Sequence, residues 1–159
     1  MRKVNYVDLF SGVGGLSLGL EMAGFENLFS NEFDNEIANS YIKNFPNHKM
    51  INEDINNVDF NSLKSSLGLN NDSVDLIVGG PPCQGFSMAN RKRIDEDPRN
   101  LLFTQFQKSV SILKPKCFLI ENVMGMNSES VNISSNEFII RENLSDYFKK
   151  IGYTIKFTS

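Results

Sequence analysis

The chain has 159 residues, 40% of them hydrophobic, and its 16 Lys and Arg against 19 Asp and Glu give a formal charge of -3. This length predicts one domain that buries its own core. Two cysteines and one histidine exclude a disulfide framework and a four-ligand zinc site, and they indicate a reduced, cytoplasmic protein. No apolar run approaches the roughly 20 residues of a membrane span, the start lacks a signal-peptide pattern, and the acidic balance argues against binding nucleic acid by charge alone.

Short apolar runs alternate along the chain with longer amphipathic runs. The apolar runs predict strands at Val4–Leu9, Asn27–Asn31, Lys49–Ile51, Val74–Val78, Cys117–Ile120 and Tyr153–Phe157. The amphipathic runs predict helices at Gly14–Ala23, Asn35–Asn44, Phe60–Leu67, Leu101–Leu113 and Glu137–Ile151. Helices of this length between strands imply right-handed crossovers, so the sequence predicts a doubly wound α/β domain with a mainly parallel sheet.

Two stretches interrupt the alternation. Gly79–Asn100 is rich in Pro, Gly and charged residues, and a loop this long inside a compact domain is usually functional. Met126–Asn136 is rich in Ser and Asn and is typical of a surface loop. The chain stops at Ser159, directly after the last expected strand, which leaves room for a longer parent protein or a separate partner chain.

A glycine-rich turn follows the first expected strand, in the run from Asp8 to Gly15. Glycines let the backbone turn tightly and approach a ligand, and the helix that follows offers free N–H groups. Glu32 ends the next strand, where an acid can accept hydrogen bonds from the two hydroxyls of a ribose. These features predict a site for a nucleoside-containing ligand. The alternative is a glycine turn without a ligand, and the glycine spacing does not decide between a dinucleotide and S-adenosylmethionine.

Two further residues fit such a ligand. Phe10 lies within the turn, where its ring can cover an adenosyl group or a methionine tail. Asp54 follows the third expected strand, where a carboxylate can accept a hydrogen bond from the amino group of adenine. An isolated Asp at this position is more often an ordinary loop residue, and its place at the same sheet edge favours the functional interpretation.

The cysteines call for different interpretations. Cys83 follows Pro81 and Pro82 after the fourth expected strand, so the prolines fix the backbone that presents it at the ligand crevice. We expect a reactive thiol there, although a free thiol near its usual pKa of about 8.5 needs local activation. Cys117 lies in an apolar run and is expected to be a buried small hydrophobe.

Glu121 directly follows the fifth expected strand, beside the strand that delivers Cys83. Four apolar residues precede it, so we expect the carboxyl to be half-buried and able to hold or donate a proton on a ligand. The alternative is a solvated acid at the end of a strand.

Several motifs together resemble the amino-terminal part of the cytosine-C5 DNA methyltransferases, from residue 4 to residue 123. The motifs are Asp8-Leu9-Phe10-Ser11-Gly12-Val13-Gly14-Gly15-Leu16, Ser30-Asn31-Glu32-Phe33-Asp34, Glu53-Asp54-Ile55, Gly79-Gly80-Pro81-Pro82-Cys83-Gln84-Gly85-Phe86-Ser87, Asp97-Pro98-Arg99-Asn100-Leu101-Leu102 and Pro115-Lys116-Cys117-Phe118-Leu119-Ile120-Glu121-Asn122-Val123. The resemblance implies a Rossmann-like methyltransferase domain with S-adenosylmethionine as cofactor and no metal.

The resemblance also implies roles for individual residues. Cys83 is then the nucleophile that adds to C6 of the target cytosine, and Glu121 holds N3 of that base. Gln84, Ser87 and Asn122 are expected to contact the substrate, and Ser87 and the basic run Arg91–Arg93 are candidates for phosphate contacts. The expected cofactor contacts are Phe10, Ser11, Gly12, Gly14, Gly15, Glu32, Phe33, Asp54, Ile55, Pro82 and Leu102.

The implied substrate is double-stranded DNA with the target cytosine flipped out of the helix, in a restriction-modification type system. In the family, an arginine-bearing motif, a target-recognition region and a final motif follow the point where this chain ends. Residues 1–159 are therefore expected to be a cofactor-binding catalytic domain that ends before the target-recognition region, either as a fragment or as one subunit of a split enzyme.

Three alternatives remain open. The tRNA-methylating branch of the same family shares the cysteine and glutamate motifs. A module that binds S-adenosylmethionine without turnover could regulate a partner. A dinucleotide-binding oxidoreductase is disfavoured, because nothing in hydride transfer calls for the Pro-Pro-Cys-Gln motif.

Overall fold

The computed structural model describes residues 2–71, 73–81, 100–121 and 146–156. Its regular elements, in chain order, are β1 (Asn5–Leu9), α1 (Gly15–Met22), β2 (Glu26–Asn31), α2 (Asn35–Asn44), β3 (Met50–Ile51), α3 (Phe60–Ser66), β4 (Leu76–Gly79), α4 (Asn100–Leu113) and β5 (Cys117–Ile120). Residues 146–150 form a further helical turn. The sequence predicted these nine elements with bounds within two residues of those observed.

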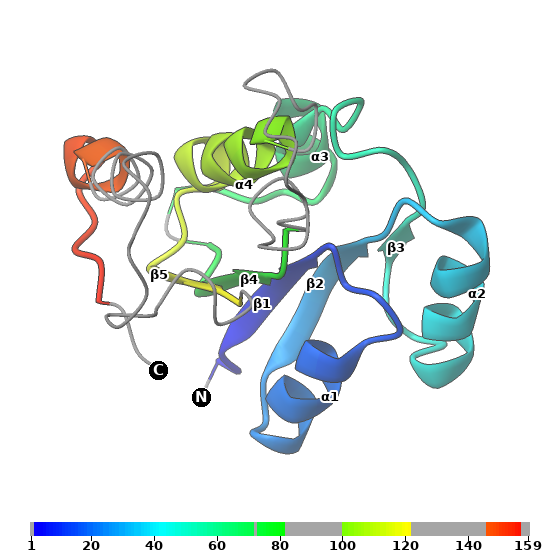
Figure 1. Ribbon diagram of the computed structural model, residues 1–159. Coiled ribbons are helices and arrows are strands. Elements are labelled where there is room, and N and C mark those ends of the chain that lie inside the picture. The colour runs from blue at the N-terminus through cyan, green and yellow to red at the C-terminus, as the bar shows by residue number, and fades with distance from the viewer. Residues whose placement is uncertain (1, 72, 82–99, 122–145, 157–159) are drawn as a thin grey trace, which may run out of the picture.

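The strands form one parallel sheet in the order β3-β2-β1-β4-β5, with neighbouring strands in continuous register apart from a shift between Tyr6 and Val7. This arrangement confirms the predicted doubly wound α/β fold. Figure 1 shows α1 and α2 on one face of the sheet and α3 and α4 on the other. The strand order reverses between β1 and β4, and in open α/β sheets ligands bind outside the carboxyl ends of the strands at such a point.

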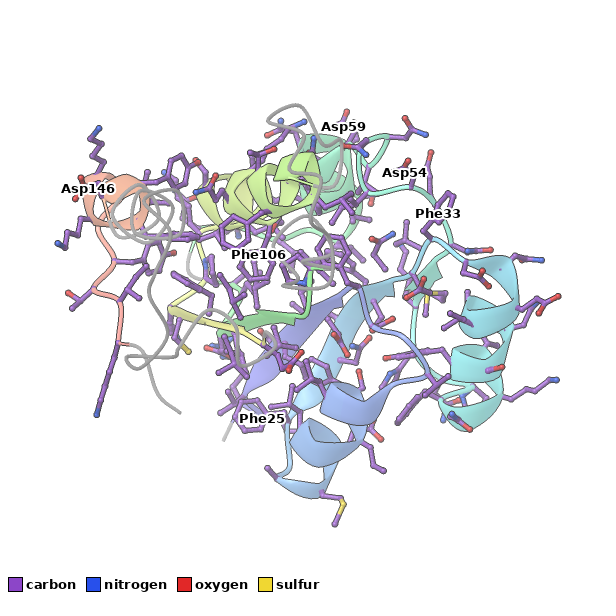
Figure 2. The ribbon with its side chains drawn as sticks, viewed as in Figure 1. Phe25, Phe33, Asp54, Asp59, Phe106 and Asp146 are labelled. Atoms are coloured by element: carbon purple, nitrogen blue, oxygen red, sulfur yellow. The ribbon has the colours of Figure 1, made fainter. Side chains whose placement is uncertain are left out.

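The two faces of β1 bury different kinds of side chain. Val7 and Leu9 face α3 and α4, where they join a cluster of fully buried residues that includes Phe60 and Phe106 (Figure 2). Tyr6 and Asp8 alternate with them and face α1 and α2, because successive side chains of a strand point to opposite faces. The α3–α4 side is therefore an apolar core, and the α1–α2 side contains buried polar groups.

The expected strand at Tyr153–Phe157 is wrong for the described residues 153–156, which form no strand. The ring of Tyr153 instead meets the edge of Phe118, at a centroid distance of 5.3 Å, and Ile155 packs against the apolar core. Their apolar pattern therefore arises from packing on the core without strand pairing. The expected helix at Glu137–Ile151 is helical where it is described, over residues 146–150, and the part before that lies outside the described residues.

The described part of the chain contains no helix with the length and apolar character needed to cross a membrane. It also contains no cluster of three or more His, Cys, Asp or Glu side chains placed to hold a metal ion.

Candidate cofactor site at the switch point of the sheet

The glycine-rich turn after β1 depends on backbone conformations that most residues avoid. Phe10 and Gly12 both have φ of 57°, and Gly14 has φ of 98° and is the N-cap of α1. A Cβ placed on Gly14 would overlap the ring of Phe45 and come within 3.1 Å of Tyr41. Glycine is thus required at position 14 for two reasons: the positive φ disfavours other residues, and a side chain there would collide with Phe45. Its absence of a side chain lets the turn lie directly on α2.

Glu32 is fixed by the turn that it faces. Its Oε2 accepts a hydrogen bond from the backbone N–H of Gly12 at 2.9 Å, and its Oε1 accepts one from the N–H of Asp34 at 2.9 Å. The side chain is half-buried. Each carboxylate oxygen accepts more than one hydrogen bond, so Glu32 can hold the turn and still accept from a ligand hydroxyl.

Two asparagines that the sequence analysis missed tie the ends of β2 and β3 together. Asn31, which is 1% exposed, donates from Nδ2 to the carbonyls of Ile51 at 2.9 Å and Glu53 at 2.8 Å. Asn52 donates from Nδ2 to the carbonyls of Glu32 and Phe33, at 2.9 and 3.1 Å. Asparagine at the end of a strand was the available signal, because its amide can replace backbone partners.

Phe33 and Asp54 lie on the same side of the molecule, at the end of the sheet where β2 and β3 finish (Figure 2). Phe33 is 71% exposed, so its ring is free to stack on a flat ligand. Oδ1 of Asp54 accepts hydrogen bonds from the N–H and the side-chain amide of Asn56, both at 2.9 Å. Its Oδ2 makes no hydrogen bond to a described residue and is available as an acceptor.

The remaining expected contacts are less accessible. Ile55 is 2% exposed within the apolar core, so only its backbone is free to contact a ligand. Ser11 is 7% exposed, and its Oγ is buried without a hydrogen-bond partner. Phe10 and Leu102 are half-buried and pack against the same apolar core. Gly15 is exposed at the start of α1, with open space where a side chain would be.

Asp8 lies beneath this turn and is fully buried. Burial raises the pKa of its carboxyl to about 6, against hydrogen bonds from Ser17 that lower it, and the nearby Glu32 carboxylate raises it further. One oxygen, Oδ2, accepts from the hydroxyl of Ser17 at 2.7 Å, and the other, Oδ1, is buried without a partner.

The structure corrects the expectation for Glu121. The residue is exposed and not half-buried, because β5 is the last strand of the described sheet. Its backbone N–H donates to the carbonyl of Gly79 at 3.0 Å, and a Cβ placed on Gly80 would lie 3.1 Å from Oε2 of Glu121. The carboxylate therefore lies against the backbone of Gly80, just before the segment that carries Cys83.

The expectation that Cys117 is buried is also wrong. Cys117 is exposed, and its Sγ donates to the carbonyl of Asp75 at 3.4 Å. The side chain lies on the face of the sheet that α1 and α2 occupy, but these helices cover β1 and β2 and leave β5 open there (Figure 1). Desolvation and the Asp75 carboxylate raise the pKa of this thiol.

Five expected site residues lie outside the described residues, as does the basic run Arg91–Arg93. They are Pro82, Cys83, Gln84, Ser87 and Asn122.

The described part of the site suits a nucleoside. Carboxylate oxygens at Glu32 and Asp54 can accept hydrogen bonds from hydroxyl and amino groups, and the exposed ring of Phe33 offers a stacking surface. Nothing lies within 4 Å of the position that a Cβ would take at Gly12 or Gly15, so the backbone of the turn is open there.

Residues 4–158 match the family model of the C-5 cytosine-specific DNA methylase. The chain is 37% identical over 155 residues to a protein named Type II methyltransferase M1.HphI of Haemophilus parahaemolyticus, covering 96% of this chain and 40% of that protein. It is 39% identical over 152 residues to one named Type II methyltransferase M.DdeI of Desulfomicrobium norvegicum, covering 96% of this chain and 35% of that protein. The chain thus spans less than half the length of both relatives.

Solved structures agree with the fold. A crystal structure assigned to a prophage-encoded DNA modification methyltransferase of E. coli superposes with a TM-score of 0.73 at 37% identity, covering 93% of this chain and 38% of that chain. A variant of Spodoptera frugiperda DNMT2 superposes with a TM-score of 0.64 at 24% identity, covering 94% of this chain and 41% of that chain, which supports the fold alone.

Proposed function

Because the chain belongs to the C-5 cytosine-specific DNA methylase family, we propose that it forms the cofactor-binding and catalytic part of an enzyme that transfers a methyl group from S-adenosylmethionine to C5 of cytosine in DNA. The relatives named as type II methyltransferases support a place in a restriction-modification system. The observation that carries the proposal is the position of Glu32, whose carboxylate is held by two backbone N–H groups at the carboxyl edge of the sheet, opposite the glycine turn.

In the proposed reaction, the protein makes C5 of cytosine nucleophilic. The Cys83 thiolate adds to C6, while Glu121 holds N3 and stabilises the electron-rich ring; this splits one difficult step into two easier ones. The cofactor, when bound, would supply the electrophilic methyl group that C5 attacks, and breaking its methyl–sulfur bond would leave the neutral demethylated product. Loss of the C5 proton to a base then expels the thiolate from C6 and restores the aromatic ring, so Cys83 is regenerated.

We further propose that activity needs more polypeptide than residues 1–159. The chain spans 40% and 35% of the two relatives, and its charge of -3 gives it little attraction for a phosphate backbone. A target-recognition region, present in the same chain or in a second one, would supply the basic contacts and the sequence readout. The cytosine must leave the duplex to reach a site at the edge of the sheet.

Calorimetry with S-adenosylmethionine and its demethylated product tests the cofactor site. Glu32→Ala should weaken binding of both by about 10-fold or more, because hydrogen bonds to a charged acceptor are worth about 1.5 to 3 kcal/mol. Glu36→Ala, an exposed acid in the first turn of α2, makes the same charge change and should leave binding unchanged. Equal affinity of Glu32→Ala and wild type, or tighter binding of NAD than of the sulfonium compound, would overturn the assignment.

Covalent trapping tests the chemistry. A duplex containing 5-fluorocytosine should form a denaturation-resistant adduct with the chain once the remaining segment of a relative is joined to it, because fluorine cannot leave as the C5 proton does. Cys83→Ser should abolish the adduct, and Cys117→Ser, at the exposed cysteine, should not. An adduct that survives Cys83→Ser would reject Cys83 as nucleophile, and methyl transfer to tRNA but not to DNA would reject DNA as substrate.

A further inference from the structure

A line of buried polar side chains connects Asp8 to the surface on the α1–α2 side of the sheet. The four fully buried members are 0% exposed and come from four elements: Asp8 from β1, Ser17 from α1, Ser30 from β2 and Tyr41 from α2. The side chain of His48, in the loop after α2, is 8% exposed and stacks on the ring of Phe45. Nothing in the proposed methyl transfer explains why so many polar groups are buried here.

Six short contacts join these groups and branch at Tyr41. On one side, the hydroxyl of Tyr41 is 2.7 Å from Ser17 Oγ, which is 2.7 Å from Asp8 Oδ2. On the second side, it is 2.6 Å from Ser30 Oγ, which is 3.0 Å from Asn27 Nδ2. On the third side, it is 2.9 Å from His48 Nδ1, and His48 Nε2 is 2.6 Å from Glu21 Oε1. The network therefore starts at a buried carboxyl beneath the glycine turn and ends at Glu21, an exposed carboxylate on α1.

The hydrogens of the network can be counted, because each hydrogen bond needs one. Asn27 gives one hydrogen to its contact, and the hydroxyls of Ser17, Ser30 and Tyr41 give one each. A neutral imidazole at His48 gives one more, which leaves six contacts with five hydrogens when the Asp8 carboxyl is ionised. One close pair of electronegative atoms would then have no hydrogen between them, and that arrangement is costly in a buried site.

One additional proton gives each of the six contacts a hydrogen, and this proton can be bound to Asp8 or to His48. On Asp8 it makes the carboxyl donate to Ser17, Ser17 to Tyr41, and Tyr41 to Nδ1 of a neutral His48. On His48 it makes Nδ1 donate to Tyr41, Tyr41 to Ser17, and Ser17 to an ionised Asp8. The two states contain the same number of protons and differ only in the direction of the hydrogen bonds between Asp8 and His48.

The environment of each end is compatible with both states. The raised pKa of Asp8, about 6, lets the carboxyl hold the proton up to about pH 6, and burial raises the pKa of Tyr41 to about 12, so its phenol relays hydrogen bonds without ionising. Besides Ser17 and Tyr41, Asp8 faces the Glu32 carboxylate and the Tyr6 phenol. His48 faces Glu21 and Tyr41, and its ring meets the edge of Tyr6 at 6.4 Å.

We propose that Asp8 and His48 share one proton through Ser17 and Tyr41, and that His48 is thereby a positioning residue that sets the charge of Asp8 beneath the glycine turn. A proton held on His48 leaves Asp8 negative, and a proton held on Asp8 leaves it neutral.

If the proposed function is right, the charge of Asp8 changes the affinity of the site for the cofactor relative to its affinity for the product. S-adenosylmethionine carries a sulfonium charge that its demethylated product lacks. An ionised Asp8 beneath the turn favours the cation, so cofactor binding draws the shared proton towards His48, and product release allows it to return. This second step rests on the proposed function, whereas the shared proton does not.

The shared proton is testable in the chain without any ligand, because His48 is its only histidine. Nitrogen-15 spectra of the imidazole across pH should show the neutral ring with its hydrogen on Nε2, and the carboxyl carbon of Asp8 should titrate through the same steps as His48, since coupled groups share their transitions. A neutral ring with its hydrogen on Nδ1, or independent titrations of the two groups, would overturn the proposal.

Variants can distinguish an effect of Asp8 on His48 that passes through the hydrogen bonds of Tyr41 from a direct electrostatic effect of the Asp8 charge. In Asp8→Asn the amide N–H supplies the missing hydrogen, so a larger fraction of His48 than in the wild type should be the neutral ring with its hydrogen on Nε2 and Nδ1 accepting from Tyr41. Tyr41→Phe breaks the relay and keeps the charge of Asp8, so adding Asp8→Asn to it should change His48 little. Tyr147→Phe removes a hydroxyl that lies away from the network, where it donates to the carbonyl of Gln107, and Asp8→Asn should keep its full effect there. An equal effect of Asp8→Asn in the Tyr41→Phe background would show direct electrostatics and overturn the relay.

The cofactor step has its own measurement. The ratio of affinities for S-adenosylmethionine and its demethylated product should fall several-fold in Asp8→Asn and remain at the wild-type value in Tyr147→Phe. An unchanged ratio with both ligands bound would overturn the cofactor step alone. Absence of binding by either ligand would overturn the proposed function, and the histidine spectra would still decide whether the proton is shared.

Discussion

Replacing Gly14 by Ala should be one of the most destabilising single-methyl changes in the chain. Two costs add at this position. A non-glycine residue at φ of 98° carries backbone strain of about 1 to 2 kcal/mol. The new Cβ would also overlap the ring of Phe45, and displacing a packed ring costs about 1 to 3 kcal/mol more. The expected loss is therefore about 2 to 5 kcal/mol, a large fraction of the 5 to 15 kcal/mol that typically holds a domain folded.

Two other glycines in the same segment separate these costs. Gly12 has φ of 57° and no atom within 4 Å of an added Cβ, so Gly12→Ala should show the strain alone, about 1 to 2 kcal/mol. Gly19 lies inside α1 with open space around it, so Gly19→Ala should stabilise the chain by about 0.5 to 1 kcal/mol. The same methyl group should thus have opposite effects at Gly14 and Gly19.

Urea unfolding followed by far-ultraviolet circular dichroism measures all three variants. With a denaturant slope of about 1 to 3 kcal/mol per molar, the midpoint of Gly14→Ala should fall by about 1 to 2 M and that of Gly19→Ala should rise slightly. If Gly14→Ala costs no more than Gly12→Ala, the contact with Phe45 does not exclude a side chain and the argument is refuted.

Four further substitutions test stability. Asp34→Ala should cost about 1 kcal/mol in thermal unfolding, because the Asp34 side chain caps α2 by accepting from two backbone N–H groups. Asp59→Ala, the cap of α3, should cost a similar amount and leave cofactor binding unchanged. The pKa of Asp8 is about 6 in the folded chain against an ordinary value of 3.8. Its contribution to the free energy of unfolding is therefore fully present below about pH 4 and is lost as pH rises through 6. Asp8→Asn should remove this pH dependence, about 3 kcal/mol between pH 4 and 7, in urea unfolding followed across pH. Phe106→Ala should cost about 3 to 5 kcal/mol by calorimetry, because the ring is fully buried.

The sequence was sufficient for the elements whose own residues determine them. Apolar runs identified β1 to β5, and the residues that follow β1, β2 and β3 were expected at one sheet edge because parallel strands end together. Glu32 was assigned correctly to that edge, where it accepts a hydrogen bond from the N–H of Gly12, 20 positions earlier in the sequence. Local pattern and strand direction carry this information.

The burial of side chains on β5 depends on which helices cover that strand, and the apolar pattern of the strand itself does not contain this information. Cys117 and Glu121 were expected to be buried or half-buried from their apolar neighbours, but β5 is the last described strand and α1 and α2 do not extend over it. The six-contact network was missed for a related reason. Its members lie on four separate elements and a loop, and only the packing of α1 and α2 on one face brings Asp8 within reach of Ser17 and Tyr41.

The outer edge of β5, which no described strand covers, bears on how the chain could pair with copies of itself. The strand is entirely apolar, Leu119 is 49% exposed, and no described residue pairs with its outer side. An unpaired edge of this kind is a template for adding another strand. Lys116 and Glu121 flank it with opposite charges, so parallel in-register stacking places like charges together, whereas antiparallel pairing matches Lys with Glu. The flanking charges therefore disfavour open-ended, amyloid-like growth and direct any self-association at this edge towards a closed, two-fold pair.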